Sequence, residues 1–210
     1  MLVVYHRKIL QEALQNEVRP HALRAITKAN VRQDALRGQL GHDEYHFDNN
    51  AFEESYTYIE ENRALIGPAL EAGRVEGAWA AFGRLSHTAQ DFYAHSNYVN
   101  LWLSQFDEGS APPASEIAHA DPDLLQSPDL HSGKLYYPLE LLTYIPLLRG
   151  FVLPYIPKDS HAWMNLDSPK QGEKFAYVYA AAVKCTRDEW GKTIGGFSDE
   201  LVERLLWEGE

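Results

Sequence analysis

Apolar residues recur at helical spacing along most of the chain. Between residues 75 and 106, one stripe holds residues three or four positions apart, which share a helix face: Trp79, Phe82, Leu85, Ala89 and Phe92. Similar spacing predicts helices over residues 5–15, 20–37, 51–70 and 171–192, and Ser198 is placed to cap a short last helix. No segment has the alternation of a half-buried strand. The pattern predicts an all-α fold, with residues 1–210 forming one single-domain helical bundle.

Two segments between these helices have a different character. Prolines and acidic residues predict a long loop over residues 107–132. Residues 135–157 are apolar but interrupted by prolines and by Arg149, so no run approaches the roughly 20 apolar residues of a membrane span. We interpret residues 139–157 of this second segment as part of the core. The alternative is a lipid or nucleobase pocket lined by Tyr136, Tyr137 and Tyr144.

Composition and charge narrow the choice of function. The 210 residues, 45% of them hydrophobic, suit one globular domain. The formal net charge of −11 argues against non-specific electrostatic binding to nucleic acid backbones or anionic lipid surfaces. Residues 1–8 lack the features of a signal peptide, and the single cysteine, Cys185, cannot form an internal disulfide. We therefore expect a cytoplasmic protein in which Cys185 is a small core residue on a helix.

Three potential metal ligands, His87, Asp91 and His95, recur every fourth residue in the predicted central helix. Asp91 is the only Asp, Glu, Lys or Arg between residues 85 and 106, and a bound cation is the simplest partner for such a charge. Neighbours in this stripe are about 6 Å apart along the axis, so the two histidines are about 12 Å apart. This separation predicts two or more ions with Asp91 bridging them. The alternative is a set of hydrogen-bonded i,i+4 pairs on a helix surface.

Other histidines and aspartates stand where they would complete such a site. Any one of them alone is more often a cap, a turn residue or a core residue than a ligand. Asp48 either hydrogen-bonds to a metal ligand and orients it or caps the following helix. Asp167 is also expected to orient a ligand without binding the metal itself. Together with the central stripe, the candidates are His6, Asp34, His46, Asp48, His161 and Asp167.

The order of His6, Asp34, His46 twelve residues later, and then His87-x3-Asp91 and His95 resembles the zinc-dependent phospholipase C and single-strand nuclease superfamily. Residues 46–49 (HFDN) and 90–97 (QDFYAHSN) are similar also to its heterokaryon-incompatibility-type relatives. The match spans most of the chain. This resemblance implies an all-α phosphoesterase with a polynuclear zinc site of three ions among its helices.

The resemblance also implies how the ligands divide between the ions. One ion would be held by Asp34, His46, His87 and Asp91. A second would be held by His6 and Asp91. The third would use His95 with His161, because residues 165–168 (NLDS) resemble a segment of the heterokaryon-incompatibility-type proteins.

Two positions of the resemblance stay open. Secreted members use the amine and carbonyl of an amino-terminal tryptophan as ligands, so here either Met1 takes that part or the second set is incomplete. His119 and Asp123 also have suitable spacing for the third ion, but Pro122 between them argues against a regular helix.

These features predict a metal-dependent phosphoric-ester hydrolase, phospholipase C-like, in which metal-bound hydroxide attacks a phosphodiester. Asp34 and Asp91 would be the catalytic carboxylates, holding two or three Zn²⁺ or other divalent ions. The expected substrate is a phospholipid or small phosphoester, and the acidic balance disfavours nucleic acid.

One alternative is a non-catalytic helical binding domain that the metal stabilises. Another is a His-Asp-type phosphohydrolase built on His42 and Asp43. A di-iron bundle fits least, because only one Glu-x-x-His occurs, at residues 116–119.

Overall fold

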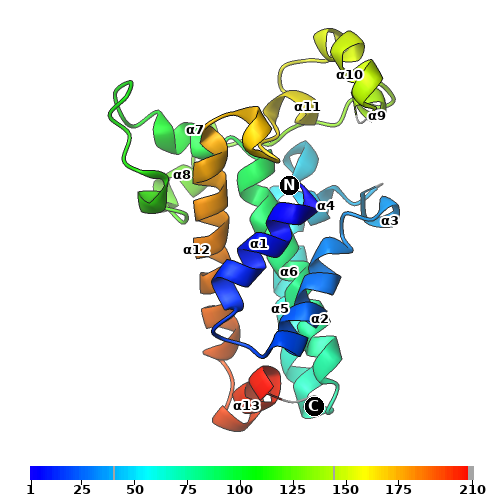
Figure 1. The fold of residues 1–210 in the computed structure, drawn as a ribbon, viewed down its shortest axis with the longest axis vertical. Coiled ribbons are helices and arrows are strands. Elements are labelled where there is room, and N and C mark those ends of the chain that lie inside the picture. The colour runs from blue at the N-terminus through cyan, green and yellow to red at the C-terminus, as the bar shows by residue number, and fades with distance from the viewer. Residues whose placement is uncertain (40, 144, 208–210) are drawn as a thin grey trace.

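The computed structural model describes residues 1–39, 41–143 and 145–207, and over these ranges the chain is helical (Figure 1). The described residues contain only two isolated β-bridges and no strand, so the all-α prediction is confirmed. The longer helices are α1 (Val3–Leu14), α2 (Pro20–Val31), α5 (Phe52–Glu71), α6 (Val75–His95), α12 (Lys174–Ile194) and α13 (Asp199–Trp207). The shorter ones are α3 (Leu36–Gln39), α4 (Asp43–His46), α7 (Tyr98–Leu103), α8 (Pro122–Leu125), α9 (Leu139–Thr143), α10 (Pro146–Val152) and α11 (His161–Met164). Single 3-10 turns form η1 (Asp48–Asn50), η2 (Ala114–Glu116), η3 (Leu153–Tyr155) and η4 (Pro169–Gln171).

Helix α6 is the central element of the bundle. It contacts α2, α5 and α12, while α1 packs on α2 and α12. The five apolar residues of the predicted stripe are all at most 5% exposed, as expected for a core helix. In Figure 1, α13 lies at one end of the bundle and α9, α10 and α11 lie at the other, near the amino terminus. A helix buried on most of its faces can carry ligands only toward an internal site.

A glycine allows α2 and α6 to approach closely. A Cβ added to Gly83 would lie 2.4 Å from the carbonyl oxygen of Ile26. We expect Gly83→Ala to lower the free energy of unfolding by about 1–3 kcal/mol, because the backbone of α2 would have to move. Urea denaturation measures this loss. The matched control is Gly191→Ala on α12, where the added carbon meets no atom within 4 Å; equal losses in the two variants would contradict the packing argument.

The predicted helix over residues 75–106 is wrong in its second half. It ends at His95, and a separate helix, α7, begins at Tyr98. The backbone N–H of Asn97 donates to the carbonyl oxygen of His131, and that of Gly133 donates to the carbonyl oxygen of His95. Hydrogen bonding to the 131–133 loop therefore replaces the next helical turn, which local periodicity cannot anticipate.

The predicted helix over residues 20–37 is also divided. It ends at Val31, and turn-type hydrogen bonds from Gln33 to Asn30 and from Ala35 to Arg32 lead into α3. These tighter bonds turn the chain at the polar residues 32–35. The break turns Asp34 toward the candidate site described below. The other long helices match their predicted ranges to within about three residues at each end.

The interpretation of residues 139–157 as core is wrong for the residues that the structure describes, and Tyr144 lies outside them. Several apolar side chains of this segment are exposed, among them Leu147 (85%) and Phe151 (77%). The segment forms α9, α10 and η3, which stand off the end of the bundle instead of filling it (Figure 1). Its prolines divide the segment into pieces too short to cover their own apolar surface. No described helix is both long and apolar enough to cross a membrane.

Candidate metal centre

Two groups of histidine and aspartate side chains lie along the inner face of α6. The first group is His6, Asp34, His87 and Asp91, and the second group is Asp48, His95 and His161. Within each group, one potential ligand atom per residue lies within 4.8 Å of the others. His87 and His95 fall in different groups, as their predicted separation of about 12 Å requires. The described residues thus have the composition of two candidate metal sites.

The first group is centred on the buried carboxylate of Asp91. Its Oδ1 is 3.2 Å from Nε2 of His6, and its Oδ2 is 3.1 Å from Nε2 of His87. Asp34 completes the group, 3.8 Å from each of the same two nitrogen atoms. Side chains that the resemblance divides between two ions therefore lie in one group.

His46 lies against the first group. Its Nδ1 is 2.9 Å from Oδ2 of Asp91 and 3.2 Å from Nε2 of His87. Its Nε2 donates to the carbonyl oxygen of Gly38, which leaves Nδ1 as the atom that faces the group. Nδ1 of His46 thus faces the position where the resemblance makes His46 a ligand.

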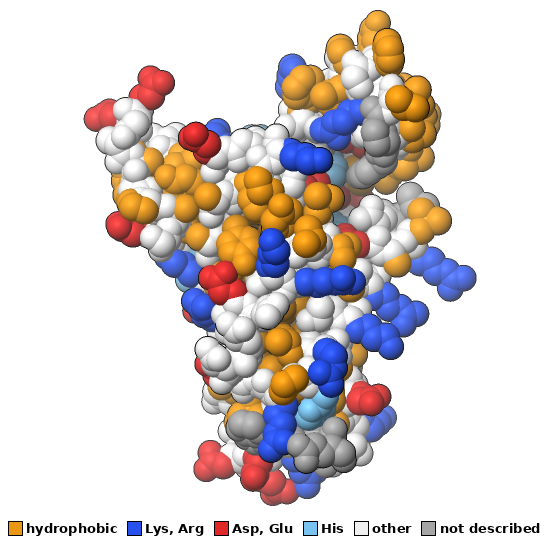
Figure 2. All heavy atoms as spheres, viewed as in Figure 1, with side chains coloured by type: hydrophobic (Ala, Val, Ile, Leu, Met, Phe, Trp, Pro, Cys, Tyr) orange, Lys and Arg blue, Asp and Glu red, His pale blue; other side chains and the backbone are white. Residues whose placement is uncertain are grey.

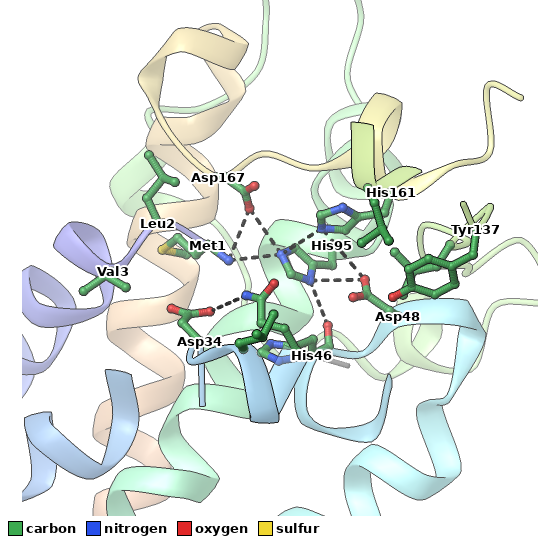
Figure 3. Close-up of a pocket in the computed structure, with 14 residues that line it drawn as sticks. Met1, Leu2, Val3, Asp34, His46, Asp48, His95, Tyr137, His161 and Asp167 are labelled. Carbon is green, nitrogen blue, oxygen red and sulfur yellow. Dashed lines mark hydrogen bonds and ion pairs between the residues drawn. The ribbon is translucent and has the colours of Figure 1, made fainter. Parts of the chain in front are cut away.

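The second group brings together three chain segments (Figure 3). Nδ1 of His95 is 3.3 Å from Oδ1 of Asp48, and Nε2 of His161 is 4.0 Å from the same oxygen. Gly133 packs so closely on α11 that an added Cβ would lie 2.5 Å from the Cα of His161. Asp48 does not cap α5, because the residue before that helix is Ala51 and no side-chain oxygen caps it. Asp48 instead points at two imidazoles, as a potential ligand.

A strained turn presents His46 and Asp48. Phe47, Asn49 and Asn50 all adopt left-handed backbone conformations, with φ of 56°, 54° and 59°. Asparagine tolerates this region, but a phenylalanine there costs on the order of 1–2 kcal/mol. Phe47 is held in place by complete burial. Strain of this kind is common where side chains are aimed at a functional site.

The Met1 amino group and Asp167 lie between the two groups. The Met1 nitrogen is 2.6 Å from Oδ1 of Asp91, 3.0 Å from Nε2 of His95 and 3.2 Å from Oδ1 of Asp167. Asp167 is also 3.2 Å from Nε2 of His95. The Met1 amino group therefore lies next to Asp91 and His95, where it would have to lie to complete a ligand set. Asp167 contacts the candidate ligand His95 but belongs to neither group.

Burial and neighbouring charge set the protonation of the first group. Burial and the adjacent His6 lower the pKa of His87 to about 4, so His87 is neutral at pH 7, the form that binds metal. Burial alone would raise the pKa of Asp91, but the Met1 ammonium and the surrounding imidazoles hold it well below its usual value. Burial likewise opposes the charge of the Met1 amino group, but the carboxylates of Asp167 and Asp91 raise its pKa to about 11. The carboxylate at the centre is thus ionised and surrounded by nitrogen atoms.

Gln90 is a supporting residue that the sequence pattern did not single out. Nδ1 of His6 donates to Oε1 of Gln90 over 2.7 Å, which directs Nε2 toward Asp34 and Asp91. Nε2 of Gln90 in turn donates to Oγ1 of Thr186 on α12. Fixing one ring nitrogen in this way sets the tautomer of a metal-ligating histidine. The signal available in the sequence was the position of Gln90 next to Asp91 in a buried helix.

Buried polar atoms of both groups lack hydrogen-bond partners, which tests whether they suit a cation. These atoms are Nε2 of His6, Oδ2 of Asp34, Oδ1 of Asp48 and Nδ1 of His87. Buried polar atoms are nearly always paired, and each unpaired one is costly. Three of these four atoms also converge within the groups: Nε2 of His6, Oδ2 of Asp34 and Oδ1 of Asp48. A divalent cation in each group would satisfy these three atoms, so the residues fit such an ion.

A cavity of about 510 Å³ gives access to the site (Figure 3). Its polar wall includes Asp34, His46, Asp48, His95, His161 and Asp167. Its apolar wall includes Leu36, Leu135, Tyr137 and Leu141. The cavity is large enough for a small organic substrate and offers it both a charged and an apolar surface.

Several sequence candidates lie elsewhere. His119 contacts Asp188 at 2.7 Å and Asp123 is exposed, so neither is in a group. His42 contacts Glu44, and Asp43 accepts a hydrogen bond from Asn49, so the His-Asp pair also lies outside both groups. Cys185 is a half-buried residue of α12, and burial with the nearby Glu189 raises its pKa to about 12. A thiol in that state is a poor nucleophile.

Comparison with known proteins gives one result. The family model of the VWA7 N-terminal domain matches residues 5–124. These residues include the whole first group, His46, Asp48 and His95, whereas His161 and Asp167 lie beyond the match. No curated protein and no solved structure matches the chain. Because the matched residues make up more than half of its length, the chain belongs to the VWA7 N-terminal domain family.

Proposed function

We propose that the chain is a zinc-dependent phosphoric-ester hydrolase related to the phospholipase C and single-strand nuclease superfamily. The observation that carries the proposal is the placement of two His/Asp groups on one helix, beside a common cavity. The order of His6, Asp34, His46, His87 and Asp91 along the chain, and their meeting in space, support the kinship. A cytoplasmic location stays a prediction from the sequence.

The donor set favours zinc over harder cations. Imidazole nitrogen together with carboxylate oxygen suits Zn²⁺, whereas Mg²⁺ and Ca²⁺ prefer oxygen ligands. When bound, zinc would polarise a phosphoryl oxygen and acidify water for attack on phosphorus. Among the residues of the first group, Asp34 is the carboxylate that lines the cavity, with a side chain that is 11% exposed. Asp34 would therefore contact both the ion and the reacting centre. Asp91, which is fully buried, would hold the imidazoles of His6 and His87 in position.

The two walls of the cavity indicate the kind of substrate. Asp48, His95 and His161, which form the second group, line the cavity where a phosphoryl group would bind. Tyr137 and Leu141 add an apolar surface to the same cavity, suited to an aliphatic or aromatic substituent. A phosphodiester with an apolar group fits this division. A purely structural metal site has four protein ligands and needs no cavity, so access to the site favours catalysis.

The test is hydrolysis by the zinc-loaded chain. We expect cleavage of at least one class among aryl phosphomonoesters, aryl phosphodiesters and short-chain phospholipids. Asp34→Asn should reduce the rate by about 100-fold or more, because it removes a charged ligand at the reacting centre. Asp107→Asn, in an exposed loop, is the matched control. A chain with both groups loaded that cleaves none of these compounds would favour the metal-stabilised binding domain instead.

A further inference from the structure

The end of the molecule formed by α9, α10 and η3 has an exposed apolar surface. Leu147, Phe151 and Tyr155 are 85%, 77% and 80% exposed. Leu147 and Phe151 are four residues apart on α10 and therefore share one side of it, and Tyr155 ends the η3 turn that follows. Leu139 and Ile145 add further exposed apolar area. Figure 2 shows hydrophobic side chains gathered at the place that α9 and α10 occupy in Figure 1. We call these five residues the apolar cap.

The apolar cap lies in a part of the chain without exposed negative charge. The chain has 30 acidic residues and a formal net charge of −11. Only one acidic residue, Glu140, falls within residues 135–158, and it is completely buried. Lys134 and Lys158 border the segment and are exposed, and Lys134 pairs with the neighbouring Asp159 at 2.9 Å. The segment therefore does not repel phosphate headgroups, although the protein as a whole is acidic.

The apolar cap also adjoins the mouth of the cavity. Tyr137 and Leu141, which line the cavity, are themselves 49% and 43% exposed and belong to the same segment. Leu36 on α3 also lines the cavity and is 74% exposed. Exposed apolar side chains thus line a cavity that also holds the polar site. A surface that receives the apolar cap would lie against this entrance.

We propose that the apolar cap inserts into the headgroup region of a phospholipid surface and holds the cavity against it. Side chains that are about 80% exposed project from the molecule, and such a projection suits a deformable lipid surface. Tyr155 and Trp163, with Lys158 3.0 Å above the Trp163 ring, are residue types that gather at membrane interfaces. An apolar patch of this kind on a protein surface marks an interaction site. Docking does not depend on the proposed hydrolysis, although the choice of phospholipid as substrate rests on it.

The test is sedimentation of the full chain with phosphatidylcholine vesicles. We expect the wild type to bind and the double variant L147D/F151D to lose about tenfold or more in its partition coefficient, because two apolar side chains that would insert into the lipid become charged. Neither residue lines the cavity, and both are exposed, so the fold should be retained. Leu65→Asp on α5 is the matched control: Leu65 is 53% exposed but lies outside the apolar cap, so vesicle binding should be unchanged.

Different outcomes separate docking from hydrolysis. Equal vesicle binding by wild type and L147D/F151D, or no binding by the wild type, would overturn the docking proposal. Self-association that the double variant abolishes, without vesicle binding, would also overturn it and assign the apolar cap to a second copy of the chain. Vesicle binding without cleavage of any phosphoester would support docking and contradict the hydrolase. If both proposals hold, L147D/F151D should cleave a soluble aryl phosphodiester at the wild-type rate but vesicle phospholipid about tenfold more slowly or worse.

Discussion

Asp91→Asn is expected to release the metal from the first group and to abolish phosphoester hydrolysis. The two carboxylate oxygens of Asp91 face different imidazoles, those of His6 and His87, and the residue is completely buried. Asparagine keeps the shape but removes the charge that a cation needs. Loss of an outer partner of a ligand already lowers metal affinity about 10–100-fold, so loss of Asp91 should exceed about 100-fold.

The same substitution should also weaken the metal-free fold. The Met1 amino group and three imidazoles contact the Asp91 carboxylate in the interior. Removing one partner of a buried ion pair costs about 3–5 kcal/mol, because the remaining charge stays buried. Urea denaturation in the presence of chelator isolates this effect, with Asp107→Asn as the control. Wild-type metal content and hydrolysis in Asp91→Asn would contradict the assignment of the first group.

Removal of metal by a chelator is expected to lower the thermal midpoint by about 5–10 °C for each ion removed. Ions that bind only the folded chain stabilise it by about 2.7 kcal/mol when present at 100 times their dissociation constant. For a domain of this size, 1 kcal/mol corresponds to about 2–4 °C. The physical source is the set of converging buried atoms without hydrogen-bond partners, which a bound cation would satisfy.

Differential scanning calorimetry with and without chelator measures this shift, and adding zinc back should restore it. Asp91→Asn should show a smaller response, because its first group holds little metal before the chelator is added. An unchanged midpoint in a wild-type protein that contained metal would place the ions outside the folded interior. It would then contradict the account of both groups.

The central helix could be predicted because its signals are local. Periodicity located the apolar stripe, and the absence of other charges around Asp91 marked it as a residue in need of a partner. The separation of His87 and His95 into two groups follows from helix geometry alone. These features survive in the structure because α6 is one regular helix from Val75 to His95.

The errors came from features that depend on distant segments. The end of α6 is set by hydrogen bonds to the 131–133 loop. Asp48 has the short carboxylate of a helix cap, and only its contacts with His95 and His161 distinguish it as a potential ligand. Residues 135–157 have the composition of a core segment, but composition does not reveal whether a segment has anything to pack against. The exposed apolar cap was therefore beyond prediction from the sequence.

The most direct measurement is the number of metal ions per chain in purified wild type, Asp48→Asn and Asp91→Asn, determined by elemental analysis after loosely bound ions are removed. The account predicts two zinc or similar ions in the wild type, one in each group. Asp48→Asn should lose the ion of the second group and keep that of the first, whereas Asp91→Asn should lose the first. A wild type that is folded without metal, even after exposure to zinc, would contradict the account and leave the His/Asp groups as a buried hydrogen-bond network.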